Sequence, residues 1–353
     1  MMELFINGAG CISPQLSFDN SVFLPETKEY LNNKLFCTEP DYSVFFDAAS
    51  VRRMSRVIKF AVGAAIIALR ESGVNVPGAI ATGTGLGLLE NSGKFLKNVI
   101  EHNESLVSPT SFIQSTHNTI GGIIALMTGC HAHNFTFSQK GISFEGALND
   151  ARMLMTETDT DNCLFGGFDE LTEYSLAIMS RLNILRKEPC SNLELYGENG
   201  NGIIAGEGAS FFVLAKEMSA TSYAKLIDNQ VFFQPENIED IQNKIITFLD
   251  KNELSVKQLD VVITGLGGDR ERDKFATELN RNMFLTQTIS GYKHLCGEYM
   301  TSSSFAFWLA AKMLKTGDIP ESTILENRFR QPKSILIYNS YKSDHSLVLF
   351  KSC

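Results

Sequence analysis

The chain has 353 residues, of which 44% are hydrophobic and 20% are charged, and it carries a formal net charge of −9. This composition is typical of a globular protein, and a negative charge without any Lys/Arg-rich run argues against a nucleic-acid partner. The seven cysteines are scattered and lack CxxC spacing, which disfavours a disulfide framework or a zinc site and favours reduced thiols. No signal-peptide pattern and no apolar run of roughly 18 residues is present, so we expect a cytoplasmic protein without a membrane span.

The first 217 residues alternate between predicted strands and helices. Strands are expected over Leu4–Ala9, Gly78–Thr84, Asn134–Ser138, Asn162–Phe168 and Ala209–Lys216, and helices over Arg53–Ser72, Thr110–Met127 and Ser143–Thr156. Gly73 is expected to end its helix, because glycine readily takes the left-handed conformation found there. The polar segment Glu188–Gly202 is predicted to be an exposed loop.

The second half repeats this alternation. Helices are expected over Asn237–Asp250, Arg272–Asn280 and Thr301–Lys315, and strands over Asp260–Gly265, Phe284–Ile289, Ser334–Asn339 and Ser346–Lys351. Strand–helix alternation predicts an α/β protein with largely parallel sheets covered by helices. We expect two copies of one α/β unit, residues 1–217 and 218–353.

The segment NFTFSQKGISFEGALNDARML, residues 134 to 154, begins as a strand and ends as an amphipathic helix. Many enzymes place a nucleophile at such a joint, because a helix N-terminus offers free N–H groups and a partial positive charge. Here the joint carries Gln139 and Lys140. The question is whether this joint is a catalytic site or a former one.

Six stretches together resemble the β-ketoacyl-acyl carrier protein synthases. They are FINGAGCISP, MSRVIKFAVGAAIIALRESGV, GAIATGTGLGLLENSGKFLKNV, VSPTSFIQSTHNTIGGIIALMTG, LFGGFDELTEYSLAIMSRLNIL and AGEGASFFVLAKE, in the family's order. The resemblance implies the thiolase-like fold, in which two duplicated halves form a five-layered αβαβα core. It also implies a dimer in which the strand Asn134–Ser138 pairs across the two-fold axis.

Active members of the family carry a cysteine at the joint, two histidines in the C-terminal half and a lysine before the second histidine. The thiolate takes an acyl group from a carrier protein, and the histidines stabilise the enolate formed when malonyl-carrier loses CO2. In this chain the alignment puts Lys140 at the nucleophile position, or Gln139 after a one-residue shift. A protonated lysine there opposes the helix dipole by roughly 0.3–1 kcal/mol, so we expect it to point away or to pair with Glu145. A neutral, Schiff-base lysine is the alternative.

The remaining catalytic positions are also altered. The first histidine aligns with Gly265, whereas the second is kept as His294 and its lysine is replaced by Ile289. Tyr341 begins the segment that replaces the family's Gly-Phe-Gly-Gly gate. One of four catalytic positions therefore survives.

This pattern resembles the chain-length factors, ketosynthase-like subunits that lack the cysteine and form heterodimers with a catalytic ketosynthase in fatty-acid, polyketide or aryl-polyene-type synthesis. The resemblance implies a catalytic ketosynthase, or a second copy of this chain, as partner, with an acyl carrier protein as a further candidate. The alternative is an active 3-oxoacyl-carrier synthase, acyltransferase or malonyl-carrier decarboxylase that uses Lys140 or a displaced thiol such as Cys163 or Cys296. A third hypothesis is a homodimer that binds acyl ligands without turning them over.

The candidate catalytic residues are thus His294 and Lys140, and the candidate substrate contacts are Gln139, Phe112, Phe144 and Tyr341. Each has a structural alternative: His294 as a buried histidine without function, and Phe112 and Phe144 as core or interface residues rather than the wall of an acyl channel. Cys130, His131 and His133 form too weak a pattern for a metal site. The GTGLG turn lacks the Lys-Ser/Thr of a phosphate loop, so no nucleotide or other cofactor is predicted. Asp169-Glu170 is expected to form a hydrogen-bonded turn and not an acid–base pair.

Overall fold

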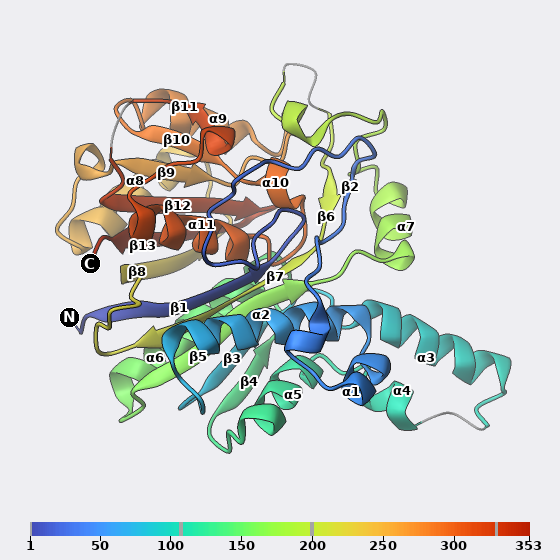
Figure 1. The fold of residues 1–353 in the computed structure, drawn as a ribbon. Helices are drawn as coiled ribbons and strands as arrows, with labels where there is room; N and C mark the ends of the chain where they lie inside the picture. Colours follow the sequence, from blue (N-terminus) through green and yellow to red (C-terminus); the bar gives the residue numbers. More distant parts are fainter. Residues whose placement is uncertain (1, 106–108, 198–200, 329–330) are drawn as a thin grey trace.

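The computed structural model describes residues 2–105, 109–197, 201–328 and 331–353. Eleven strands of the described residues form one large sheet in the order β11-β10-β9-β12-β13-β8-β1-β7-β5-β3-β4, and helices cover this sheet. Figure 1 shows the first half of the chain in blue and green at the β4 end and the second half in orange and red at the β11 end.

The two halves of the sheet have the same strand order. In the first half β1 (Leu4–Ile12), β7 (Gly208–Ala215), β5 (Asn162–Asp169), β3 (Ile80–Gly83) and β4 (Asn134–Phe137) follow one another. In the second half the corresponding strands are β8 (Ala224–Phe233), β13 (Asp344–Lys351), β12 (Ser334–Tyr341), β9 (Val261–Thr264) and β10 (Thr288–Gly291). In both, the first two pairings are antiparallel and the last two are parallel. The expected boundary between residues 217 and 218 lies in the loop between β7 and β8.

Three hydrophobic clusters define the layers. The outer cluster of the first half contains α2 (Arg56–Ser72) and α5 (Thr119–Thr128), and that of the second half contains α8 (Ile238–Lys251) and α9 (Lys274–Asn282). The central cluster joins α6 (Ser143–Glu157) and α11 (Ser303–Thr316) to strands of both halves. Outer helices, one half of the sheet, the central helices, the other half of the sheet and outer helices give the five-layered αβαβα thiolase-like fold that the resemblance implied.

Shorter elements complete the chain. They are α1 (Ala48–Arg53), α3 (Leu89–Glu101), α4 (Pro109–Ile113), α7 (Glu173–Arg181), α10 (Lys293–Cys296), β2 (Lys34–Leu35), β6 (Ala205–Gly206) and β11 (Ile324–Glu326). Strand β2 pairs with β6 in a separate two-stranded sheet.

Helix α2 lies unusually close to β1 because two glycines of that strand face it. A Cβ atom on Gly10 would lie 2.1 Å from the carbonyl oxygen of Ala64, and one on Gly8 would lie 2.2 Å from that of Ala68. The helix ends as predicted at Gly73, whose φ is 73°. The glycines of FINGAG are therefore required by the packing of strand against helix.

Several predicted boundaries were wrong. The helix expected over Arg53–Ser72 is broken at Met54-Ser55, and the one expected over Thr110–Met127 is divided into α4 and α5. The strand expected over Phe284–Ile289 begins four residues later, at Thr288. Strand β8 was not predicted at all. The segment Glu188–Gly202, expected to be an exposed loop, contains the fully buried Asn192. Residues 198–200 of this segment lie outside the described residues.

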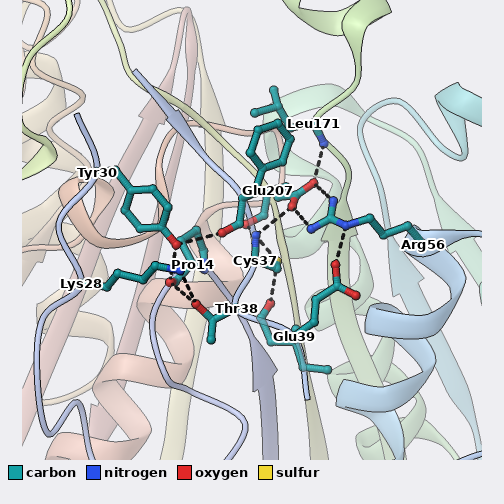
Figure 2. Close-up of polar contacts among 11 residues, drawn as sticks. Pro14, Lys28, Tyr30, Cys37, Thr38, Glu39, Arg56, Leu171 and Glu207 are labelled. Atoms are coloured by element: carbon teal, nitrogen blue, oxygen red, sulfur yellow. Dashed lines mark hydrogen bonds and ion pairs between the residues drawn. The ribbon is translucent and has the colours of Figure 1, made fainter. Parts of the chain in front are cut away.

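A buried ion-pair network holds the N-terminal loop against α2 and β7 (Figure 2). The Glu207 carboxylate is fully buried, and it accepts hydrogen bonds from the Arg56 guanidinium, from the Cys37 N–H at 2.8 Å and from the Leu171 N–H at 3.0 Å. Arg56 also pairs with Glu39. A buried carboxylate is tolerated when it is paired and hydrogen-bonded in this way.

Candidate functional site

The joint between β4 and α6 has the backbone of a nucleophile elbow. Lys140 has a φ of 55°, in the left-handed region that residues with a Cβ rarely occupy, and a short 3-10 helix from Lys140 to Ile142 leads into α6. The buried Ser143 hydroxyl accepts a hydrogen bond from the Gln139 N–H at 2.8 Å and donates one to the Lys140 carbonyl at 2.7 Å. A strained strand-to-helix turn is thus held in place, although it presents no thiol or hydroxyl nucleophile at residues 139 and 140.

The side chains at the tip of the elbow are exposed. Ser138, Gln139 and Lys140 all face solvent in the single chain. The expected pairing of Lys140 with Glu145 is not found: Glu145 is buried, and one of its oxygens accepts a hydrogen bond from Ser346 Oγ at 2.9 Å. Burial raises the pKa of Glu145. Among the described residues Lys140 has no carboxylate partner and its side chain is exposed, which fits the other arrangement expected from the dipole.

Tyr341 and Met300 fill the space next to the elbow. A Cβ atom on Gly141 would lie 2.2 Å from Cγ of Tyr341, and one on Gly85 would lie 2.1 Å from Cβ of Met300. Tyr341, a predicted substrate contact, is thus in van der Waals contact with the first turn of the elbow. The Tyr341 side chain covers the backbone at Gly141. A ligand could reach the N–H groups of this turn only if that backbone were uncovered.

No space remains for a side chain at Gly265, the position aligned with the first catalytic histidine. A Cβ atom there would lie 2.3 Å from Oδ1 of Asn339. The same oxygen accepts a hydrogen bond from the Tyr292 hydroxyl at 3.0 Å. The polar pair Asn339–Tyr292 therefore occupies the region where the resemblance expects an imidazole.

His294 is held away from the elbow. Its Nε2 lies 2.6 Å from the Ser322 carbonyl oxygen, its Nδ1 lies 3.3 Å from the Tyr196 hydroxyl, and its ring contacts that of Tyr196. Burial lowers the pKa of His294 to about 4, although the hydrogen bond to Ser322 opposes the shift. The imidazole is therefore neutral at pH 7, and each of these contacts goes to a residue outside the elbow. The structure does not bring His294 and Lys140 together.

The neighbouring residue, Lys293, was missed in the sequence. Its Nζ lies 2.6 Å from Oε2 of Glu298, and their side chains are only 4% and 14% exposed. The sequence holds a local indication of this pair. Lys293 begins α10, Gly297 ends it, and Glu298 follows directly. A buried ion pair needs such close geometry to offset its desolvation.

Comparison with known proteins decides the family. Residues 25–220 match the family model of the N-terminal domain of β-ketoacyl synthases. The chain belongs to the β-ketoacyl synthase family. Its sequence is 24% identical over 202 residues to 3-oxoacyl-[acyl-carrier-protein] synthase 2 of Vibrio cholerae, a match that covers 53% of this chain and 49% of the relative. The corresponding enzyme of Vibrio harveyi is 23% identical over 206 residues, which cover 54% of this chain and 48% of the relative. The match thus spans about half the length of these curated relatives.

Solved structures share the fold of this ketosynthase-like chain over its whole length. A β-ketoacyl synthase from Burkholderia phymatum superposes with a TM-score of 0.79 at 16% identity and full coverage of both chains. The ishigamide ketosynthase/chain length factor gives 0.82 at 15% identity and covers 100% of this chain and 99% of that one. A ketosynthase in complex with its chain length factor from Xenorhabdus doucetiae gives 0.77 at 14% identity, with 100% and 98% coverage.

Asp169 has a structural role in this ketosynthase-like fold. Its Oδ1 accepts hydrogen bonds from Thr84 Oγ1 and from the N–H groups of Gly85 and Leu86, and its Oδ2 accepts two from Thr301. With five donors the carboxylate fixes the GTGLG turn to the start of α11. The expected turn at Asp169-Glu170 is wrong in its location, because Asp169 is the last residue of β5 and its carboxylate instead holds the GTGLG turn.

The two candidate phenylalanines lie in different environments. Phe144 is 1% exposed and packs against Phe165, Phe212 and Phe307 in the central layer. Its ring has no face open to a ligand, so the interpretation as a core residue holds. Phe112 is exposed and contacts Phe95, with ring centroids 5.6 Å apart.

The thiols considered as displaced nucleophiles are buried away from the elbow. Cys163 lies in β5 and Cys296 in α10, and burial raises the pKa of both. Since the thiolate is the nucleophile, such thiols are unreactive at neutral pH.

The described residues contain no cluster of three or more His, Cys, Asp or Glu side chains arranged for a metal ion. In the weak CHAH pattern, His133 Nε2 instead pairs with Asp150 at 2.8 Å, and the Cys130 thiol donates to the Pro77 carbonyl. Among the described helices, none has the length and apolar character that a membrane crossing requires.

Proposed function

We propose that this chain is a non-condensing partner of a catalytic β-ketoacyl-acyl carrier protein synthase, of the chain-length-factor type, in fatty-acid, polyketide or aryl-polyene-type synthesis in the cytoplasm. The observation that carries the proposal is the elbow itself, whose residue Lys140 has a left-handed backbone. The residues aligned with the thiol of active members are Lys140 or, after a one-residue shift, Gln139. The condensing reaction needs a nucleophilic atom there that accepts the acyl group, as the thiolate does in active members. Neither the lysine nor the glutamine of this elbow supplies a thiolate.

The filled pocket supports the absence of condensation. Tyr341 covers Gly141, and Asn339 occupies the space beside Gly265. Replacing Lys140 alone would therefore not rebuild a catalytic centre, because the imidazole and the space for the substrate are missing as well.

An open sheet edge supports the role of partner. Within the described residues β4 pairs with β3 alone, so its other backbone edge is free. Phe135 on this edge is 57% exposed, Leu126 on α5 is 85% exposed, and Met153 on α6 is also exposed. A free, flat edge flanked by apolar side chains is a template for pairing with another chain. We call β4 with these three side chains the β4 face.

The experiment is co-expression of this chain with the intact ketosynthases of the same organism, followed by size-exclusion chromatography with light scattering. We expect a one-to-one heterodimer with one of them. Phe135→Asp should abolish it, because a charge would be buried at the centre of the β4 face. Leu285→Asp is the matched control, since Leu285 is 60% exposed but precedes β10 at the other end of the sheet. The partner role would be refuted if the chain elutes as a monomer or a homodimer in every one of these co-expressions.

An active synthase, acyltransferase or decarboxylase with a rearranged site remains the alternative function. Incubation with an acyl-carrier thioester and measurement of intact mass separates the two, because only the alternative gives a covalent adduct or a decarboxylated product. A homodimer whose melting temperature rises with an acyl ligand, but which forms no product, would instead indicate passive binding of acyl chains. An acyl carrier protein would then be the partner that delivers the acyl chain.

A further inference from the structure

A second cleft lies away from the β4 face, between α9 and the segment that precedes residue 197. Its volume is about 910 Å³, and its lining includes Leu195, Tyr196, Arg270, Asp273, Lys274 and Arg281. Neither the elbow nor the β4 face contributes to it. The cleft is large enough for a small-molecule ligand.

Cations line one wall of this cleft. Lys274 and Arg281 are seven residues apart on α9 and so lie on the same face of the helix, and Arg270 belongs to the turn before it. Within the described residues none of these three side chains forms a hydrogen bond or an ion pair, whereas the intervening Arg272 pairs with Asp269. Three unpaired cations gather here in a chain whose net charge is −9.

The carboxylates of the cleft only partly neutralise this wall. Asp273 accepts hydrogen bonds from the N–H groups of Gly267 at 2.8 Å and Gly268 at 2.7 Å, so both of its oxygens already have partners. Burial raises the pKa of Asp273, although these hydrogen bonds and the charge of Lys293 oppose the rise. With Glu278 as the other carboxylate, the lining keeps an excess of one positive charge.

The opposite wall is apolar and fixed in position. The Tyr196 hydroxyl accepts a hydrogen bond from the Lys293 N–H at 3.1 Å and lies 3.3 Å from His294 Nδ1, so it is already engaged. Tyr196 is partly exposed and lines the cleft, whereas the neighbouring Leu195 is only 1% exposed. A ligand that fits both walls has an anionic end and a planar or apolar body.

We propose that this cleft binds a small phosphate ester with a planar body, such as a nucleoside phosphate, whose phosphates contact Lys274, Arg281 and Arg270. Charged hydrogen bonds to phosphate suit these side chains, and Tyr196 would stack against the planar body. The proposal goes beyond the role of dimer partner and does not depend on it.

The test is calorimetric titration of the purified chain with ADP, pyrophosphate and adenosine in low salt. We expect ADP to bind most tightly, pyrophosphate more weakly and adenosine not measurably. The double variant Lys274→Gln/Arg281→Gln should weaken ADP binding by roughly tenfold for each lost charge-assisted hydrogen bond. Both side chains are exposed, so the variant should keep the melting temperature of the parent chain. Lys97→Gln, an exposed cation of α3, is the control and should bind ADP normally.

Three outcomes would overturn the proposal. ADP and pyrophosphate could fail to bind at millimolar concentration, the double variant could bind ADP as tightly as the parent chain, or adenosine could match ADP. Polyglutamate that binds here more tightly than ADP would also overturn it, because the cationic wall would then fit an acidic protein surface. Heterodimer formation is measured separately, so failure here leaves the proposed partner role untouched.

Discussion

Gly265 and Asn339 show at the level of single residues why a histidine does not fit at position 265. Asn339 Oδ1 lies 2.3 Å from the place of a Cβ atom on Gly265, and it accepts a hydrogen bond from the Tyr292 hydroxyl. This packing around Gly265 could not be read from the sequence alone.

We predict that Gly265→His destabilises the chain by about 1–3 kcal/mol, the usual result of forcing atoms into a packed interior. The new Cβ would meet Asn339 Oδ1 at 2.3 Å. Urea unfolding measures the change, and Gly265→His combined with Asn339→Ala should recover part of it. An unchanged unfolding midpoint for Gly265→His would show that the pocket is open after all.

The cysteines offer a chemical test of the elbow. Burial raises the pKa of Cys11 to about 11 and raises those of Cys163 and Cys296 as well. We predict that iodoacetamide modifies the exposed Cys353 in the native chain and leaves these three unmodified, because only the thiolate reacts. Peptide mass spectrometry gives the result. Rapid modification of Cys163 or Cys296 would favour the alternative function, with a displaced nucleophile.

At the level of elements, the contact between α2 and β1 depends on Gly10. We predict that Gly10→Ala costs at least about 3 kcal/mol, because the methyl group would lie 2.1 Å from a backbone oxygen that cannot rotate away. The measurement is the free energy of unfolding in urea, with soluble yield as a second readout.

Gly122→Ala is the matched control for this helix–strand contact. Gly122 lies inside α5, and a Cβ atom on it would have no heavy atom within 4 Å. The substitution should stabilise the chain by roughly 0.5–1 kcal/mol through helix propensity alone. Equal effects of the two substitutions would contradict the close-packing argument.

The elements also show what periodicity can and cannot predict. The strands β1, β3, β4 and β5 and the helices α6, α8 and α11 were found because their apolar runs and flanking glycines are local signals. Strand β8 was missed because its polar residues, including Asp228 and Asn229, are buried by partners from distant helices. The elbow and its contact Tyr341 could be located in sequence, but Met300 beside Gly85 and Asn339 beside Gly265 are neighbours that only the folded chain brings together.

At the scale of the whole molecule, Asp228 connects the two halves. It is 2% exposed, and its carboxylate pairs with Arg152 of α6 at 2.8 Å and with Lys251 of α8 at 2.9 Å. Burial alone would raise the pKa of Asp228, but hydrogen bonds from Lys251 and Asn252 and the charge of Arg152 outweigh it, so the pKa is lowered.

We predict that Asp228→Asn destabilises the chain by about 1–3 kcal/mol at pH 7, because it removes the buried carboxylate that pairs with Arg152 and with the partly exposed Lys251. A carboxylate with a lowered pKa contributes its full stability above its unfolded pKa of roughly 4, and this contribution is lost as the pH falls through the folded pKa. The difference between the variant and the parent chain should therefore shrink below about pH 4. Urea unfolding at pH 7, 5 and 3.5 tests this, and a difference that is independent of pH would contradict it.

Asp169 reaches from the first half of the chain to the start of α11, while Ser346 reaches from the second half to Glu145 on α6. Each half thus fastens the central helix of the other, and none of these contacts involves Lys140, Gly265 or His294. Substitutions at those three positions therefore leave the anchoring of α6 and α11 in place, and the backbone of the central layer does not depend on which side chains line the elbow.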